Sequence, residues 1–106
     1  GTLAREVDNG HLENVYRLQI MNATERVQTY RISAEGLPAM QQQPTTTINL
    51  GPVEARWVTV SLRVPPETVA RAGPGAHEIH FTVERQTTPT EEAHRVRERS
   101  TFVVPR

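Results

Sequence analysis

The residues of this chain that could bind a metal are histidine and methionine, because imidazole and thioether groups are ligands for copper. The sequence has four histidines, two methionines and no cysteine. His77 and His80 lie three residues apart, and on a strand such residues face opposite sides of the sheet. We expect Met21 at a strand end and Met40 in a loop. The pattern therefore predicts no metal site and no cofactor in this chain. A copper-handling domain built from these four side chains is the alternative.

Groups that could act in catalysis are equally dispersed. The sequence has no glycine-rich phosphate loop and no Gly-x-Ser-x-Gly motif. Glu91 and Glu92 fall in a polar stretch, residues 87–94, which we expect to be the exposed tip of a hairpin, where no pocket shifts a carboxyl pKa. Glu98 is in phase with apolar neighbours, which predicts either a bulge or an ion pair with an arginine at the sheet edge. The sequence therefore predicts no catalytic residue.

Trp57 and a stripe of arginines are the candidates for contact with a partner. Arg95, Arg97 and Arg99 alternate along the last predicted strand and should share its outer face. They form either a solvated face that discourages pairing between sheet edges, or a contact for an acidic partner or anionic headgroups. Trp57 is out of phase with the valines that follow it, so either a bend turns it inward or it is an exposed anchor for a partner. The 12 basic and 12 acidic residues balance, which does not predict nucleic-acid binding.

Alternation of apolar and polar residues with a period of two dominates the chain and predicts antiparallel strands with one buried face. After a short first strand near residues 3–7, the alternating runs cover residues 12–20, 30–34, 48–50, 58–64, 79–83 and 96–104. Turn residues separate these runs, as at Asp8-Asn9-Gly10 and Gly36-Leu37-Pro38. Pro66–Ala72 is expected to form one helical turn at most.

About seven short antiparallel strands in 106 residues predict one all-β domain, an immunoglobulin-like two-sheet Greek-key β-sandwich over residues 1–106. No apolar run is long enough for a membrane span or a signal-peptide core. The chain begins with Gly1, and we expect it to be one domain of a larger protein. Asn22-Ala23-Thr24 matches the N-glycosylation pattern, and a tight turn with a left-handed Asn22 explains the same residues.

Several runs of residues resemble one bacterial family. Residues 10–24, which read GHLENVYRLQIMNAT, resemble the opening of the C-terminal immunoglobulin-like domain of FixG/CcoG-type proteins, which are cytochrome c oxidase accessory proteins. The similarity continues at Tyr30-Arg31-Ile32, Gly36-Leu37, Arg63-Val64-Pro65-Pro66, Gly75, Ile79-His80-Phe81 and Glu98-Arg99-Ser100-Thr101-Phe102. The resemblance covers most of the chain, from about residue 7 to residue 102.

This resemblance implies a parent protein in the bacterial inner membrane, with several membrane spans and 4Fe–4S clusters. It implies that the parent reduces Cu(II) to Cu(I) for the assembly of cbb-type cytochrome c oxidase, and that this domain lies on the periplasmic side. The cluster ligands of the family are cysteines, and none of those positions exists in this chain. We therefore expect a non-catalytic docking or scaffolding domain, whose protein partner is an oxidase subunit or a copper carrier. A generic bacterial adhesion or binding module is a further alternative.

Overall fold

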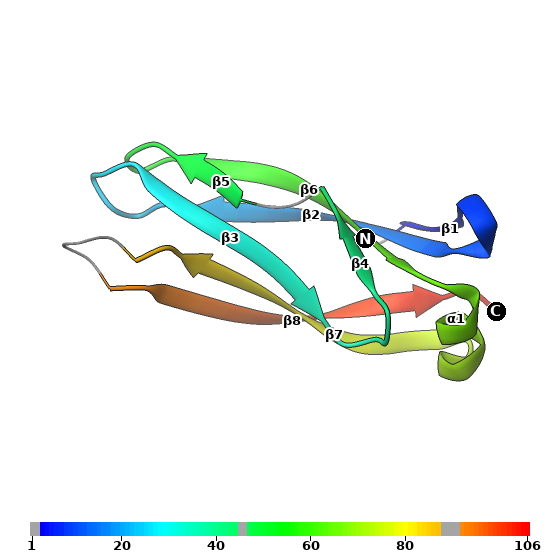
Figure 1. Cartoon of the computed structure of the whole chain (residues 1–106). Helices are drawn as coiled ribbons and strands as arrows, with labels where there is room; N and C mark the ends of the chain where they lie inside the picture. Colours follow the sequence, from blue (N-terminus) through cyan, green and yellow to red (C-terminus); the bar gives the residue numbers. More distant parts are fainter. Residues whose placement is uncertain (1–2, 45–46, 88–91) are drawn as a thin grey trace.

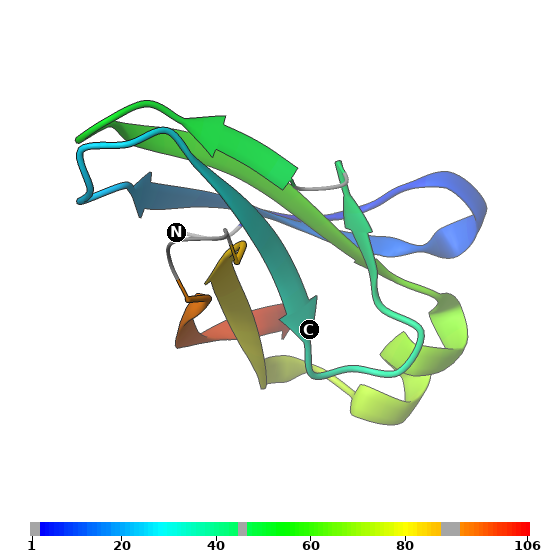
Figure 2. The ribbon, with the colours of Figure 1, turned by 60° about the vertical axis from the view of Figure 1, so that its left-hand side comes forward.

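The computed structural model describes residues 3–44, 47–87 and 92–106, which form two antiparallel four-stranded sheets packed face to face (Figures 1 and 2). Sheet A has the strand order β1-β2-β6-β4, and sheet B has the order β5-β3-β7-β8. The strands are β1 Leu3–Glu6, β2 Leu12–Met21, β3 Gln28–Glu35, β4 Gln41–Gln43, β5 Thr47–Leu50, β6 Ala55–Val64, β7 Gly75–Arg85 and β8 His94–Val104. The predicted immunoglobulin-like sandwich is confirmed, with eight strands rather than about seven.

The strand that sequence reasoning missed is β4, which consists of Gln41, Gln42 and Gln43. These residues carry no apolar alternation, so the strand is recognised only through its pairing with β6. The side-chain amide of Gln42 also donates to the carbonyl of Ile32 in sheet B, at 3.0 Å. The strand therefore links the two sheets although its own side chains are polar.

The helix α1, Pro66–Ala72, is about two turns long, where one turn at most was expected. Pro66 stands at the start, where a missing backbone N–H costs no hydrogen bond. Glu67 lies in the first turn and Arg71 in the last, so each charge complements the helix dipole at its own end. The helix ends at Gly73, whose φ of 74° favours glycine.

Alternating burial along the strands builds one apolar core between the sheets. The ring of Tyr16 from sheet A meets that of Phe81 from sheet B edge-on, with centroids 5.0 Å apart and planes at 71°. The other buried apolar residues are Leu12, Ile20, Tyr30, Ile32, Leu50, Val60, Leu62, Val64, Ile79, Phe102 and Val104. Removing these side chains from water is the main source of the stability of the fold.

A close approach of two backbones follows β3. Gly36 has a φ of +149°, and a Cβ atom at this position would lie 2.8 Å from the Cα atom of Ile79. Only glycine fits this contact, because both the backbone conformation and the space exclude a side chain. The predicted turn after β3 is therefore also a point of close packing between the end of β3 and β7.

Among the described residues, two strand edges remain unpaired on one side of the sandwich. β1 pairs only with residues 12–15 of β2, although β2 continues to Met21. In the part of the chain that the structure describes, β8 pairs with β7 alone. The helix α1 and β1 lie at one end of the molecule, and the loop after β2 lies at the other (Figure 1). No helix among the described residues is long and apolar enough to cross a membrane.

Candidate functional site

Two side chains from the first half of β2 reach across to β8, the edge strand of sheet B. Asn14 is fully buried, and its Nδ2 donates to the carbonyl of Val103 at 3.1 Å, while the Val103 N–H donates to its Oδ1 at 2.8 Å. Two residues further on, the hydroxyl of Tyr16 donates to the carbonyl of Thr101 at 2.7 Å. Burial raises the pKa of Tyr16 well above its usual range, so the hydroxyl keeps its proton. We call the part of the sandwich from these bonds to α1 and β1 the closed end.

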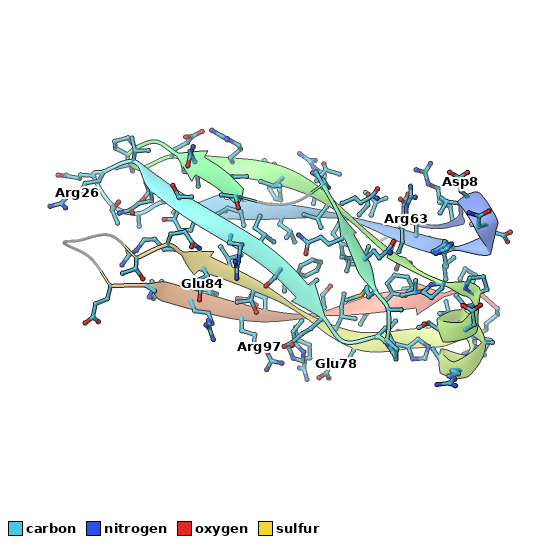
Figure 3. The ribbon with its side chains drawn as sticks, viewed as in Figure 1. Asp8, Arg26, Arg63, Glu78, Glu84 and Arg97 are labelled. Carbon is cyan, nitrogen blue, oxygen red and sulfur yellow. The ribbon has the colours of Figure 1, made fainter. Side chains whose placement is uncertain are left out.

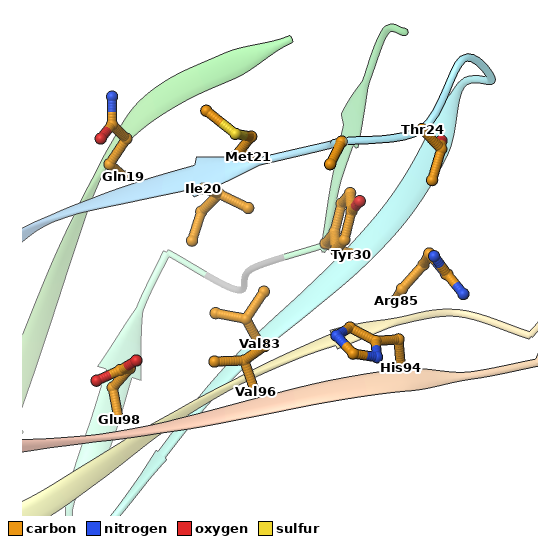
Figure 4. Close-up of a pocket in the computed structure, with 11 residues that line it drawn as sticks. Gln19, Ile20, Met21, Thr24, Tyr30, Val83, Arg85, His94, Val96 and Glu98 are labelled. Atoms are coloured by element: carbon orange, nitrogen blue, oxygen red, sulfur yellow. The ribbon is translucent and has the colours of Figure 1, made fainter. Parts of the chain in front are cut away.

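Beyond these bonds the two edges separate and leave an apolar cleft, which we call the β2–β8 groove. It consists of two adjoining cavities of about 430 and 440 Å³, which share Gln19, Ile20, Val83 and Glu98 as lining residues. Ile20 of β2 points toward Val83 of β7 and Val96 of β8 (Figure 4). We call this part of the molecule, with residues 18–27 on one side and residues 94–99 on the other, the open end.

Exposed apolar side chains gather at the open end. The described residues include five large apolar side chains that are exposed, namely Met21, Val27, Val53, Trp57 and Val96. Trp57 is 55% exposed on the outer face of sheet A, so it is not turned inward. The guanidinium of Arg17 lies over its ring, 5.0 Å from the centroid, in a cation–π contact. A gathering of this kind on a folded domain is typical of a binding surface.

Glu98 differs from both expectations for this position. The pairing of β7 with β8 is continuous, with Glu98 opposite Phe81, so no bulge resets the register. The side chain is exposed and forms no ion pair with any described residue. The physical reason is the groove, because the inner face of β8 is open to solvent here and a charge at an inward position stays hydrated.

The arginine stripe lies on the outer face of sheet B. Each arginine pairs with a glutamate of the same sheet: Arg95 with Glu84 at 2.8 Å, Arg97 with Glu35 at 3.0 Å and Arg99 with Glu78 at 3.7 Å. Figure 3 shows Glu84, Arg97 and Glu78 following one another along this face. The hydrogen bond from Arg95 lowers the pKa of Glu84. The structure places Arg95 and Arg97 away from Trp57, whereas Arg99 and Trp57 line the same cavity.

The four candidate copper ligands are not brought together. Met21 pairs with Ala55, whereas the residue after Met40 pairs with Arg63, and these partners are about 26 Å apart along β6 at ~3.3 Å per residue. His77 hydrogen-bonds the carbonyl of Gly73 through Nε2 at 2.7 Å. His80 is partly buried on the opposite face, 3.6 Å from Glu78. Among the described residues, no three histidine, aspartate or glutamate side chains could hold a metal ion together.

Asn22 is fully buried, which excludes both expectations for the Asn22-Ala23-Thr24 run. Its φ is not in the left-handed region. Its Nδ2 donates to the carbonyls of Arg26 at 2.7 Å, Gly51 at 2.9 Å and Leu50 at 3.3 Å, and its Oδ1 accepts from the N–H and hydroxyl of Thr24. An amide nitrogen in this environment is inaccessible to a glycan. Asn22 instead ties the loop after β2 to the end of β5.

A buried carboxylate lies on the outer face of sheet A at the closed end. Glu13 is 2% exposed and receives hydrogen bonds from Arg63 and Arg5, each at 2.8 Å. The bond from Arg63 is the main reason that the pKa of Glu13 lies below its ordinary value of 4.5, and burial opposes part of this effect. Glu13 therefore stays ionised and joins three strands, since Arg5 is on β1 and Arg63 on β6.

Sequence reasoning missed the free edge of β2, although the sequence contained a signal for it. A first strand of about five residues cannot cover a second strand that is twice as long. A second signal is Asn14, a polar residue in phase with Leu12 and Tyr16, which marks a buried amide that needs partners. Its partner at Val103 depends on how the two sheets pack, and no local pattern contains that information.

These features define the class of protein: an immunoglobulin-like β-sandwich domain with one closed and one open end. The chain belongs to the family described as "IG-like fold at C-terminal of FixG, putative oxidoreductase", whose model matches residues 1–105. The family therefore describes a non-catalytic domain of an oxidoreductase.

Two solved structures are similar to this chain. A FixG-related protein from Vibrio parahaemolyticus is 25% identical, with a TM-score of 0.69 over 97% of this chain and 94% of that chain. A protein from Archaeoglobus fulgidus is 14% identical, with a TM-score of 0.54 over 98% of this chain and 94% of that chain, and shows the fold alone. A search of curated protein sequences found no match.

Proposed function

We propose that this domain is the protein-docking module of a membrane-bound FixG-type oxidoreductase. The parent would hold 4Fe–4S clusters, reduce copper and assist the assembly of cbb-type cytochrome c oxidase, and the domain would dock an oxidase subunit or a copper carrier on the periplasmic side. Family membership supports the oxidoreductase parent. The membrane, cluster, copper and oxidase parts of the proposal rest on the sequence resemblance. This chain has no cysteine, so the clusters belong to the rest of the parent.

The observation that carries the docking role is the open end. Exposed apolar side chains on a small domain are costly unless something covers them, and here three of the five, Met21, Trp57 and Val96, line one groove. The groove is long and open instead of being an enclosed pocket, so it fits a protein segment better than a small molecule. A brace that only holds the parent together would not need such a surface.

The test is an exchange of this domain in the full-length parent, in its own bacterium. The matched control is the Archaeoglobus fulgidus protein, which keeps a similar fold over nearly the same length and shares only 14% of its residues with this chain. Oxidase activity is measured per molecule of parent found in the membrane. Loss of oxidase assembly in the exchanged protein supports docking. Normal oxidase assembly in the exchanged protein shows that any sandwich suffices, and this overturns the proposal.

A further inference from the structure

We propose that the β2–β8 groove binds an extended, acidic segment of the partner protein, which adds to sheet A as a strand antiparallel to β2. This inference rests on the docking role proposed above and names the surface and the chemistry of the docked segment. The bound strand would continue the line of β1 along residues 16–21 of β2. Main-chain hydrogen bonds would supply affinity, and side chains in the groove would supply specificity.

The free edge of β2 is the first support for this inference. The ladder between β1 and β2 runs from Glu6 opposite Leu12 to Leu3 opposite Val15. From Tyr16 to Met21, β2 has β6 on one side and, within the described residues, no strand on the other. Alternate residues of this stretch present their backbone N–H and C=O groups to the open side. An added antiparallel strand would therefore continue a ladder that already exists.

A comparison of the two edges of the groove shows which one accepts a strand. The β8 edge carries five ionisable side chains in a row of six residues, namely His94, Arg95, Arg97, Glu98 and Arg99. Charges of this density protect an edge strand against pairing. The β2 edge carries only one charge between residues 16 and 21, at Arg17. The β2 edge is therefore the unprotected one.

The register of β2 sets the side-chain pattern of the bound segment. Residues directly opposite each other in an antiparallel pair lie on the same face of the sheet. Leu18 and Ile20 face inward, so the two residues opposite them would enter the groove and meet Val83 and Val96. Residues opposite Arg17 and Gln19 would lie on the outer face. The segment should therefore carry apolar residues at alternate positions.

Charge complementarity makes the intervening residues acidic. The charged side chains that line the groove are Arg17, Arg85, Arg99 and Glu98, so positive charge is in excess. Arg17 forms no ion pair with any described residue, and its guanidinium lies over the ring of Trp57. Arg99 has only a long, exposed pair with Glu78. A carboxylate on the outer face of the bound strand would pair with Arg17 without breaking an existing bridge.

The experiment uses this 106-residue chain and an eight-residue synthetic peptide of alternating valine and glutamate. The similar Vibrio parahaemolyticus structure is a chain of nearly the same extent, which shows that this fold exists without further domains. Binding is measured by calorimetry, and amide hydrogen exchange is followed by NMR. We expect binding that protects alternate amides of residues 16–21 and leaves those of residues 94–99 unchanged.

Two control peptides separate the contribution of the main-chain hydrogen bonds from that of the charges. Methylation of alternate peptide nitrogens removes the ladder hydrogen bonds, and lysine in place of glutamate reverses the charge. Each change should weaken binding about tenfold or more, since it removes either the ladder hydrogen bonds or the charge attraction. A tenfold change in affinity corresponds to ~1.4 kcal/mol. In the protein, Arg17→Glu and Val96→Lys should weaken binding of the original peptide by a similar factor. Arg71→Glu on α1 and Val27→Lys outside the groove are the matched controls and should leave it unchanged.

Three results would overturn the inference. The first is the absence of binding at millimolar peptide, and the second is protection of β8 instead of β2. The third is protection of residues 16–21 that grows with protein concentration without peptide, which would assign the edge to a second copy of this chain. The docking role is judged separately. If the exchanged parent loses oxidase assembly while Arg17→Glu and Val96→Lys in the parent retain it, docking stands and the groove is the wrong surface.

Discussion

The two ends of this sandwich are held together by different kinds of interaction. At the closed end, Phe102, Leu62 and Ile79 are fully buried, and α1 and β1 cover the end of the core. At the open end, large apolar side chains are exposed, and the buried amide of Asn22 holds the loops in place. Hydrogen bonds to a fixed amide can keep an end in shape without filling it with side chains. The two ends therefore differ in how much of their apolar surface they leave exposed, although both contribute residues to the core.

The largest expected effect is a loss of core packing at the closed end. Phe102→Ala should lower the free energy of unfolding by roughly 3–5 kcal/mol, because it removes a fully buried ring and leaves a cavity. Val96→Ala on the same strand should change it by no more than about 0.5 kcal/mol, since that side chain is exposed in the groove. Denaturant unfolding measures both. Equal losses would show that Val96 is packed in the core as tightly as Phe102.

The second effect tests how the open end is held. Asn22→Ala should cost about 3 kcal/mol, because several backbone groups lose a buried partner and each such loss costs ~1–3 kcal/mol. Asn49→Ala is the matched control. Asn49 is exposed, and its side chain accepts one hydrogen bond from a described residue, the hydroxyl of Thr29, so the cost should stay near 0.5 kcal/mol. Thermal unfolding with hydrogen exchange of residues 22–28 measures the effect. A cost for Asn22→Ala no larger than that of the control would mean that water replaces the amide.

The third effect depends on pH. Glu13→Gln should cost about 2 kcal/mol at neutral pH, the scale of hydrogen bonds to charged groups. Because the folded state lowers the pKa of Glu13, its contribution is complete above the ordinary value of 4.5 and is lost as the pH falls through the lower folded pKa. Unfolding free energies measured from pH 7 to pH 2 should therefore converge for the native protein and the variant at the acidic end.

A control for this pH effect is available in Glu25, which is exposed. The difference between Glu25→Gln and the native protein should be small at pH 7, since surface charges typically contribute less than about 0.5 kcal/mol. If the gap between Glu13→Gln and the native protein stays constant from pH 7 to pH 2, ionisation of Glu13 is not what stabilises the closed end.

The smallest effect on stability should come from Trp57. Trp57→Ala removes an exposed ring and its contact with Arg17, which is worth about 0.5–1 kcal/mol at such a site. In the full-length parent, the same variant should reduce recovery of the partner in affinity purification while the membrane level of the parent stays normal. A larger loss of stability than for Asn22→Ala would place Trp57 among the residues that hold the fold.

The fold was predictable from the sequence because the pattern that specifies each strand lies within the strand itself. Alternation along β2, β6 and β7 gives the strands and their buried faces, Gly36 marks the end of β3, and Gly73 marks the end of α1. The groove was not predictable in the same way. It depends on where β2 and β8 separate, and this is decided by Asn14 and Tyr16 reaching across to β8. Glu98 shows the same limit. The sequence indicated that Glu98 falls at an inward position of its strand, but it did not indicate that a groove leaves this position open to solvent.

The bonds between Asn14 and Val103 join positions that are 89 residues apart in the chain. The amide of Asn14 points into the interior and therefore has no native partner until the last strand has been added. Contacts of such long range are formed late, since a large loop must be closed before they contribute. During synthesis, β8 must therefore have left the ribosome before the sandwich can close. Any truncation that removes β8 also removes the partners of the Asn14 and Tyr16 side chains.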